Sequence, residues 1–296
     1  MQVHLVDGHV YIFRAYFSMP EMLAPDGTPT QAAYGFANTL LRFLSERRPT
    51  HLVCCFDFGM SSFRNDVFPG YKASRVDEVP EDLAPQFEMC KQVARALGLP
   101  VFEAAGYEAD DVIATLVDGL LAEDCGVEVV SSDKDLSQLV TEDGRVRLHD
   151  LQRETTLDAD GVREKFGVDP AQIPDYLALV GDKVDDLPGV PGYGKKSAAV
   201  ALGAFGCIDG IPDELAGWEG VTVRGAARLA REIAAHREQA LQIRELATVV
   251  RKVPGIRSDL SDLVWEGAPA GAFEALCNEL GWGRIADRVP RPPRVR

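Results

Sequence analysis

Carboxylate side chains gather in short clusters along this sequence. One cluster, Glu108-Ala109-Asp110-Asp111, stands directly before an apolar run that is typical of a helix. Acids at a helix start can be ordinary caps, because the free N–H groups there attract negative charge. This cluster alone therefore fits a cap and a metal site about equally well. Four further clusters stand where strands or helices are expected to end, namely Asp7, Asp57, Asp133/Asp135 and Asp182/Asp185. Acids at so many element ends favour a metal site over capping alone.

The type of these ligands indicates which metal they would hold. Oxygen donors without His or Cys suit Mg²⁺ or Mn²⁺ better than Zn²⁺. So many carboxylates in one cleft would repel one another unless cations lay among them. Two ions roughly 4 Å apart support in-line displacement at phosphorus. We therefore expect two divalent cations, Mg²⁺ or Mn²⁺, held by Asp7, Asp57, Glu108, Asp110, Asp111, Asp133, Asp135, Asp182 and Asp185.

The elements predicted between these acids alternate between strand and helix. Short apolar runs predict strands at 3–6, 52–56, 101–102, 127–130 and 146–148, and helical spacing predicts helices at 32–46, 81–97, 108–122 and 136–140. This alternation predicts a mostly parallel α/β sheet covered on both faces, in which ligands bind beyond the carboxyl ends of the strands. Asp7, Asp57 and Asp133 stand at such ends, so the fold should gather the acids along one edge of the sheet.

The second half of the chain reads as helical. Strand signals fade after about residue 160, and helices are expected at 170–180, 195–204, 225–236 and 238–250. We therefore expect an α/β core over 1–165 and a helical part over 166–285. The Pro- and Arg-rich tail, 286–296, is expected to be disordered.

Composition limits the cellular setting. The 31 basic and 46 acidic residues give a net charge of −15, which by itself argues against nucleic acid, although net charge does not describe a local site. The six cysteines have no zinc spacing and read as core residues of a reducing compartment. The N-terminus lacks the pattern of a signal peptide, and no apolar stretch is long enough to span a bilayer. We expect a cytoplasmic protein without a membrane partner.

A long segment without clear periodicity, 58–80, lies between a predicted strand and the next helix. Basic and aromatic side chains alternate in it, namely Phe63, Arg64, Phe68, Tyr71, Lys72 and Arg75. A long loop on the same edge as the acids indicates a lid or binding loop.

A glycine-rich stretch, Gly189-Val190-Pro191-Gly192-Tyr193-Gly194-Lys195-Lys196-Ser197, nearly matches a nucleotide-binding loop. Lys196 stands where that loop needs Ser or Thr, and no strand leads into it, so we discount a nucleotide site. A tight turn between two helices explains the stretch better. Its N–H groups could hold a phosphate, with Lys195 and Lys196 adding charge. A ligand-free helix connection is the alternative.

Taken in order, these motifs resemble one family. They are Leu5-Val6-Asp7-Gly8, Arg14-Ala15-Tyr16, Phe56-Asp57, Phe63-Arg64, Pro69 to Arg75, Glu108 to Asp111, Ser132 to Leu136, and Gly181-Asp182 through Lys195. The set resembles the flap endonuclease family, specifically the bacterial 5′-3′ exonuclease domain found at the N-terminus of DNA polymerase I. The resemblance covers roughly residues 1–255.

The resemblance implies a PIN-like core, a helical arch and a helix-three-turn-helix part that binds DNA. It assigns Asp7, Asp57, Glu108 and Asp110 to a first metal, with Asp111 nearby. It assigns Asp133, Asp135, Asp182 and Asp185 to a second metal, some through water. Lys72 and Arg75 match arch residues that act on the scissile phosphate, and Tyr71 matches a residue that stacks on a displaced base. The hairpin matches the turn that grips the duplex, often with a bound K⁺. The DNA-binding set that the resemblance implies is Arg14, Tyr71, Lys72, Arg75, Gly189, Gly192, Gly194, Lys195, Lys196 and Ser197.

Two positions depart from the family pattern. Val184 and Asp186 stand where the family often has Ser and Asn, and Val184 cannot hydrogen-bond, so the surroundings of the second metal should differ. The 296 residues include no polymerase domain, so we expect a free-standing member. Asp182 and Asp185 are kept, which favours full activity.

The function implied is a structure-specific 5′ nuclease that cuts DNA near a 5′ end, flap or nick. We expect a monomer, and an RNA primer in an RNA–DNA hybrid stays open as a substrate. Two alternatives stay open: a non-catalytic protein that binds DNA junctions with the same fold, and a PIN-type ribonuclease.

Overall fold

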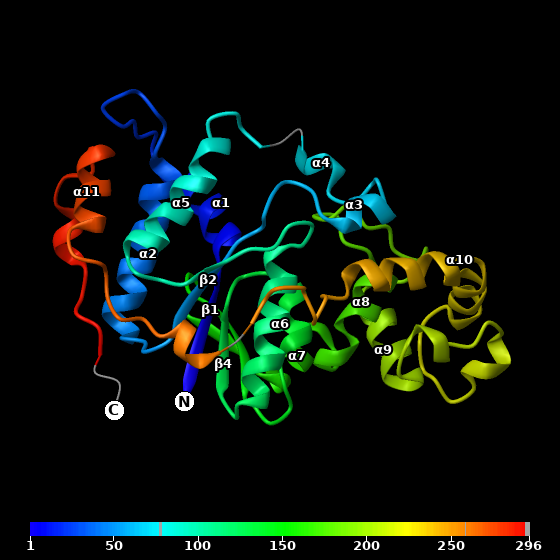
Figure 1. Cartoon of the computed structure of the whole chain (residues 1–296). Coiled ribbons are helices and arrows are strands. Elements are labelled where there is room, and N and C mark those ends of the chain that lie inside the picture. Colours follow the sequence, from blue (N-terminus) through cyan, green and yellow to red (C-terminus); the bar gives the residue numbers. More distant parts are fainter. Residues whose placement is uncertain (77–78, 258, 294–296) are drawn as a thin grey trace.

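One twisted sheet carries the acidic edge. The computed structural model describes residues 1–76, 79–257 and 259–293, with the backbone alone for Arg75 and Val76. Within this described part six strands pair in the order β3-β2-β1-β4-β5-β6 (Figure 1). Their bounds are β1 Gln2–Asp7, β2 Leu52–Cys55, β3 Val101–Phe102, β4 Gly126–Val130, β5 Val146–Asp150 and β6 Thr155–Leu157. All pairs are parallel except β5 with β6. The mostly parallel sheet is therefore confirmed.

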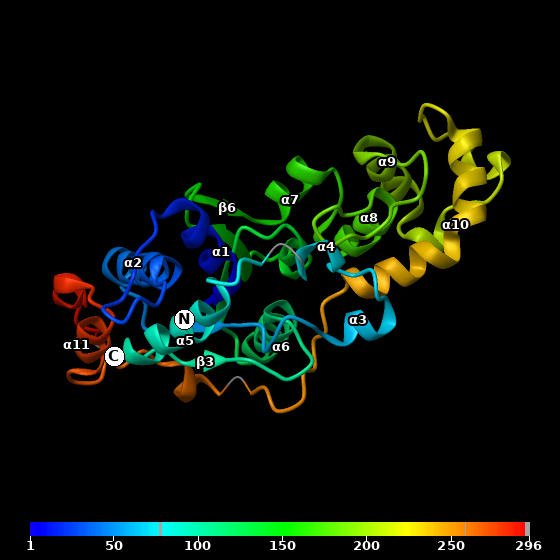
Figure 2. The ribbon, with the colours of Figure 1, turned by 90° about the horizontal axis from the view of Figure 1, so that it is seen from above.

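Helices cover both faces of this sheet, as the sequence predicts. Alternate strand residues enter opposite cores: Leu5 and Cys55 face one side, and Val6 and Cys54 face the other. The first core includes α6 (Ala109–Ala122). The second includes α1 (Gly8–Ser18), α2 (Gln31–Arg47), α5 (Ala84–Ala96) and α11 (Ala272–Glu279), which Figure 2 shows together on one side of the molecule.

Helix α1 was not predicted, because it follows β1 without an intervening loop. Asp7 ends the strand and also caps the helix, accepting a hydrogen bond from Val10 N at 3.4 Å. Gly8 is required at this junction, since a Cβ there would lie 2.4 Å from the Phe56 ring. The abrupt change from strand to helix fixes the direction of the Asp7 side chain at the carboxyl edge.

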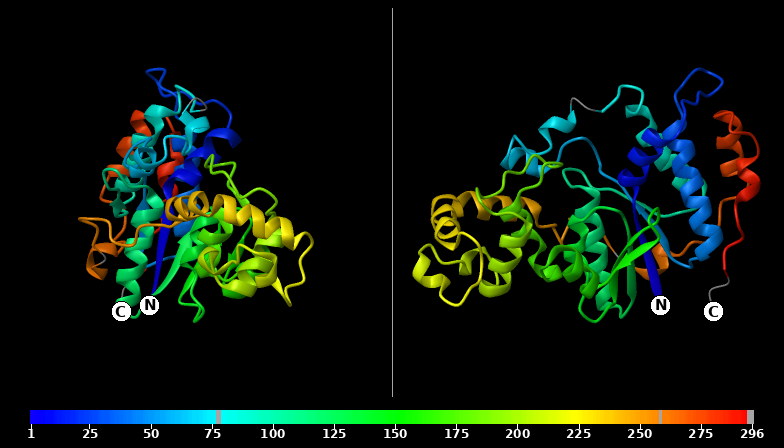
Figure 3. Two further views of the ribbon diagram at one scale, coloured as in Figure 1. Left: turned by 90° about the vertical axis from the view of Figure 1, so that its right-hand side faces the viewer. Right: turned by 180° about the vertical axis from the view of Figure 1, so that it is seen from behind.

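The helical part lies at one end of the molecule (Figure 3). It contains α8 (Ile173–Val180), α9 (Lys195–Phe205) and α10 (Ala226–Ala247), whereas α7 (Ala159–Phe166) packs beside β6. The two helices expected at 225–236 and 238–250 are one helix, α10. Arg237, at the expected break, continues the helix and donates to the carbonyls of Ile208 and Ile211.

From the last turn of α10 the chain returns along the first core, and we call residues 246–253 the strap. The Gln138 side chain donates to Ala247 O at 2.9 Å and accepts from Val249 N at 3.0 Å. Val250 N donates to the Asp111 carboxylate at 2.8 Å. The strap therefore ties the end of the helical part to α6 and to η1 (Asp135–Leu139), the 3₁₀ helix found where 136–140 was predicted.

The last part of the chain packs on the second core instead of on the helical part. Trp265 is buried and donates its indole N–H to Leu97 O at 2.9 Å. Farther on, Arg288 contacts Asn38, and Val289 packs against the core. The segment predicted as helical part, 166–285, thus lies in two places. Its boundary, and disorder of the 286–296 tail as a whole, stay predictions; residues 294–296 lie outside the described part.

Two further observations complete the fold. The six cysteines are free thiols, five of them buried. Among the described residues, helices are too short or too polar to cross a membrane.

Candidate metal centre and nucleic-acid interface

An acidic cavity of about 460 Å³ opens at the carboxyl edge of the sheet. Residues from β1, β2, α6 and the turn after β4 bring predicted acids together in its wall. These acids are Asp7, Asp57, Glu108, Asp110 and Asp133. Arg14 and Lys72 also line the cavity, so cationic side chains face the same space.

Asp7 and Asp110 are repelled by neighbouring acids of this cavity. Burial raises the pKa of Asp7 to about 7; the Ser131 hydroxyl, 2.7 Å away, opposes this shift, and Asp133 and Asp57 add to it. Burial also raises the pKa of Asp110 well above its usual value, and Asp133 and Asp7 raise it further. Such carboxylates favour protons or cations over being bare anions. These residues therefore fit a cation site.

Asp57 is oriented by two elements. Its carboxylate accepts from Ala109 N at 2.6 Å in the first turn of α6, and its own N–H donates to His9 Nδ1 at 3.1 Å. The His9 ring stacks on Phe87, with centroids 5.0 Å apart, and burial lowers its pKa, which favours the neutral imidazole. His9 was not predicted, although it stands two residues after Asp7 at the same strand end.

Glu108, two residues before Asp110, has a different environment. Lys72 Nζ lies 2.6 Å from its Oε2, the Tyr71 hydroxyl donates to the same oxygen at 3.1 Å, and Ser62 donates to Oε1 at 2.8 Å. Burial alone would raise the pKa of Glu108, but the charges of Lys72 and Arg64 outweigh it and lower the pKa to about 2. Glu108 is therefore an anion already paired with the 58–80 segment.

Helices α3 (Phe63–Val67) and α4 (Ala73–Val76) lie within the 58–80 segment. Lys72 reaches the acidic cavity from the turn between them. The Tyr71 ring is buried, so the stacking predicted on a displaced base would require the ring to leave its present site. Arg75 lies in α4, but its side chain is outside the described part, and its predicted role stays a prediction.

Asp111 is placed away from the cavity. Its two oxygens each accept from the Arg64 guanidinium at 2.7 Å, and they also accept from Glu108 N at 3.2 Å and Val250 N at 2.8 Å. Asp111 is fully buried, and Arg64 is almost so. Its carboxylate thus joins α3, α6 and the strap, and the structure does not bring it to the other predicted ligands.

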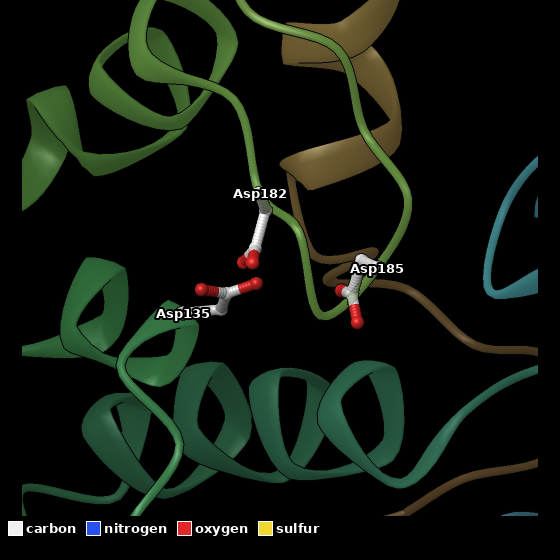
Figure 4. Close-up of side chains that lie close together, drawn as sticks. All are labelled: Asp135, Asp182 and Asp185. Atoms are coloured by element: carbon white, nitrogen blue, oxygen red, sulfur yellow. The ribbon is translucent and has the colours of Figure 1, made fainter. Parts of the chain in front are cut away.

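Three other predicted acids form a second group, the Asp135 cluster. Oxygens of Asp135, Asp182 and Asp185 lie within 4.8 Å of one another, and all three residues are buried (Figure 4). Asp135 Oδ1 has no hydrogen-bond partner among the described residues. A buried carboxylate oxygen that makes no hydrogen bond within the described part of the chain, and has the Lys134 ammonium at 3.5 Å beside it, favours further positive charge, so this group also fits a cation. Asp133, which the resemblance assigns to the second metal, lines the acidic cavity and caps Asp135 N at 2.9 Å.

Lys134 is the partner of this cluster that sequence reasoning missed. Its ammonium contacts the Asp182 carboxylate and lies 3.5 Å from Asp135 Oδ1. Burial opposes its charge, but the surrounding acids raise the pKa of Lys134 above its usual value. The alternation Asp133-Lys134-Asp135 was the available signal, because an internal cation commonly accompanies crowded acids.

The glycine stretch is a turn between α8 and α9. Gly189 packs against the Val180 carbonyl, where a Cβ would lie 2.5 Å away, and Gly192 has a φ of 90°. Gly194 begins α9 and donates to Ser197 Oγ at 2.9 Å. Lys195 and Lys196 stand exposed in the first turn of α9. Glycine is needed at 189 for the close approach and at 192 for the left-handed turn. The resulting tight turn leaves Lys195 and Lys196 exposed, where they could face a ligand.

Two family domains match consecutive parts of this chain. The 5′-3′ exonuclease N-terminal resolvase-like domain matches residues 2–167, and the 5′-3′ exonuclease C-terminal SAM fold matches residues 168–270. DNA polymerase I of Bacillus caldotenax is 35% identical over 296 residues, which cover 97% of this chain and 32% of the relative. The 5′-3′ exonuclease of Aquifex aeolicus is 38% identical over 217 residues, 73% of each protein. The chain thus spans about a third of the length of the DNA polymerase I relatives it matches.

Solved structures share the fold at low sequence identity. T5 5′-exonuclease with bound zinc has a TM-score of 0.68 at 20% identity, covering 95% of this chain and 99% of that one. The catalytic core of Rad2 in complex with DNA substrate has a TM-score of 0.63 at 16% identity, covering 95% and 88%. Because the two family domains together span residues 2–270, this chain belongs to the 5′-3′ exonuclease family.

Proposed function

We propose that this chain is a structure-specific 5′ nuclease that hydrolyses DNA phosphodiesters near 5′ ends or flap junctions, using two divalent cations. The observation that carries the proposal is the meeting of eight acids from separate elements in the acidic cavity and the Asp135 cluster. Capping explains acids at single helix ends, but it does not explain buried carboxylates that repel one another. Family membership and the bound zinc of T5 5′-exonuclease support the same reading.

The residues suited to hold the two cations fall into the same two groups. Asp7, Asp57, Glu108 and Asp110 would hold the first. The Asp135 cluster, with Asp133 at its border, would hold the second. When bound, such ions lower the pKa of coordinated water and neutralise charge on the reacting phosphate. Mg²⁺ or Mn²⁺ is the choice that an all-oxygen site favours.

Other side chains of the chain would position the substrate. Lys72 already lies in the cavity, and a cation bound to Glu108 would compete for this carboxylate and free the ammonium for the phosphate. Its positive charge would then stabilise the phosphoryl oxygens in the transition state. Arg14, in the same wall, would orient the strand.

The turn between α8 and α9 would hold the duplex. Backbone N–H groups at the start of α9 and the exposed Lys195 and Lys196 suit phosphate contacts at a distance from the reaction. A K⁺ ion in this turn, cleavage of RNA primers in hybrids, a monomeric state and a cytoplasmic location belong to the same proposal.

The decisive experiment uses DNA with a labelled 5′ flap. Wild-type protein with Mg²⁺ should release the flap, and EDTA should stop the reaction. Asp110→Asn should reduce cleavage by about 10³-fold or more, since it removes a ligand used in the transition state, while circular dichroism and the unfolding midpoint stay near those of wild type. Junction binding without cleavage under any metal condition would overturn the proposal in favour of a non-catalytic binding protein.

A further inference from the structure

The 58–80 segment makes a specific contact with the loop that carries two acids of the Asp135 cluster. Ser74 donates from both its backbone N–H and its hydroxyl to Asp186 Oδ2, at 2.9 and 2.7 Å. Two residues earlier, Lys72 N donates to Asp185 O at 3.0 Å. Three hydrogen bonds therefore join the turn around Lys72 to residues 185–186.

The backbone on both sides of this contact is strained. Lys72 has a φ of 52° and Asp186 a φ of 54°, a region that residues with a Cβ rarely adopt. Such conformations persist where the surroundings determine them. Here the two hydrogen bonds from Ser74 to Asp186, together with the one from Lys72 N to Asp185 O, hold both residues in these conformations.

The loop that carries Asp186 is closed and short. Asp182 and Leu187 exchange two backbone hydrogen bonds, each 2.8 Å long, and Val184 N donates to Asp182 Oδ1 at 2.9 Å. Asp182 and Asp185 face the Asp135 cluster, whereas Asp186 faces α4. Asp186 thus follows Asp185 directly in the chain and lies in the same closed loop as Asp182.

Lys72 lies between the two acid groups. Its backbone is held by the loop of Asp185, and its ammonium is held by Glu108 in the acidic cavity. Asn65 fixes the same turn from inside the segment by donating to Tyr71 O at 2.8 Å. The position of Lys72 therefore depends on the loop 182–187 as well as on its own segment.

We propose that Asp186 is a positioning residue whose clasp on Ser74 couples the 58–80 segment to the second cation site. The clasp sets the place of Lys72 relative to Asp182 and Asp185. Occupation of the Asp135 cluster by a cation orders the loop, and through the clasp it holds Lys72 in the cavity. Coupling of this kind is reciprocal, so a segment that has opened weakens cation binding by the same factor. The proposed nuclease function supplies the purpose of the coupling.

Limited trypsin digestion tests the clasp without DNA. Ser74→Ala removes the hydroxyl, and Asp186→Gly removes the carboxylate while tolerating the left-handed φ. Both should raise the rate of cleavage after Lys72, followed by mass spectrometry, by about fivefold, because more of the segment is open. Asp186→Asn keeps an oxygen acceptor and should stay near the wild-type rate. Ser18→Ala, at the exposed end of α1, is the matched control.

The same digestion measures the coupling. Mg²⁺ should protect wild-type protein after Lys72, and both clasp variants should need about fivefold more Mg²⁺ for half protection, as the reciprocal effect requires. The double variant should be no more sensitive than Asp186→Gly alone, since Asp186→Gly already removes the acceptor that the Ser74 hydroxyl uses. Additive effects, or wild-type behaviour of either Ser74→Ala or Asp186→Gly, would overturn the clasp. If wild-type protein does not cleave flap DNA, the nuclease proposal is overturned, but the digestion results still test the clasp.

Discussion

At the scale of single residues, carboxylates in one cavity differ in whether they bind a proton or stay charged near neutral pH. Burial and neighbouring acids raise the pKa of Asp7 to about 7, whereas Lys72 and Arg64 overcome burial and lower that of Glu108 to about 2. Glu108 keeps its charge without a cation, and Asp7 binds a proton instead. The first cation would therefore replace a proton at Asp7 and compete with an ammonium at Glu108.

This difference predicts how stability depends on pH in EDTA. The pKa of Asp7 rises on folding from 3.8 to about 7, so the folded state binds the proton more tightly. The stability that Asp7 contributes is present below about pH 4 and is lost as pH rises through about 7. Urea unfolding should show a fall in free energy over this window, and the fall should be smaller for Asp7→Asn. An unchanged slope in Asp7→Asn would contradict the assignment.

The position of Lys72 predicts that its replacement lowers the cleavage rate far more than the affinity for DNA. Lys72→Ala removes the charge expected at the phosphoryl oxygens, so the rate constant of cleavage at saturating enzyme should fall by about 10²- to 10³-fold. The Kd for flap DNA should change by less than about threefold, because the duplex is held elsewhere. Single-turnover kinetics and anisotropy measure the two quantities. Lys252→Ala, an exposed lysine in the strap, is the control, and equal losses in rate and affinity would reduce Lys72 to a binding residue.

The sequence could identify the acids but not their partners. Carboxylates at strand ends can be predicted as cation ligands from the sequence alone, because both the residue type and its position at a strand end indicate a cation site. Ser131, Lys134 and His9 act through distances between elements, and these are set by packing. Asp111 shows the limit in the other direction: it has the right type and position, yet Arg64 and the strap occupy both of its oxygens.

At the scale of elements, the pair Arg64–Asp111 holds α3 against α6. Arg64 also donates to Leu246 O at 2.8 Å, so it joins the strap to both helices. Arg64→Ala should lower the free energy of unfolding by about 3–5 kcal/mol, since it leaves a buried carboxylate without its cation. Urea titration gives this value. Arg145→Ala, whose ion pairs are at the surface, should lose less than about 1 kcal/mol.

A double variant checks the cause of that loss. Asp111→Ala combined with Arg64→Ala should cost less than the sum of the single losses, because neither charge is then left alone in the core. A strictly additive loss would mean that the two side chains stabilise the fold independently.

Elements with a clear apolar pattern could be predicted from the sequence, whereas elements that form only through contacts with distant residues could not. The strands that end at acids are short apolar runs, and helices α2, α5 and α6 are apolar on a regular period. Strand β6 has three residues, two of them exposed, and pairs only because β5 offers an edge. In α10, Arg237 reaches loop carbonyls and lets one helix continue through a position that reads as a break.

At the scale of the whole molecule, the proposed duplex site and the proposed reaction site lie on different elements. Replacing both Lys195 and Lys196 by Ala should weaken binding to all duplex sequences alike and reduce the salt slope of log K by about 1.8, the value for two lost phosphate contacts. The cleavage rate at saturating enzyme should stay within about threefold of wild type, because those contacts position without reacting. Fluorescence anisotropy at several KCl concentrations measures the slope. An unchanged slope would remove the turn from the DNA interface.

The strap has a consequence for the order in which the protein is made. Asp111 and Gln138 belong to the first half of the chain, but their hydrogen bonds need Val250 N, Ala247 O and Val249 N. Domains fold from the N-terminus as synthesis proceeds. A ribosome that has made only the sheet has made neither the strap, which holds α6 and η1 together, nor Asp182 and Asp185. Under the proposed function, a fragment that ends after the sheet should therefore not cleave DNA.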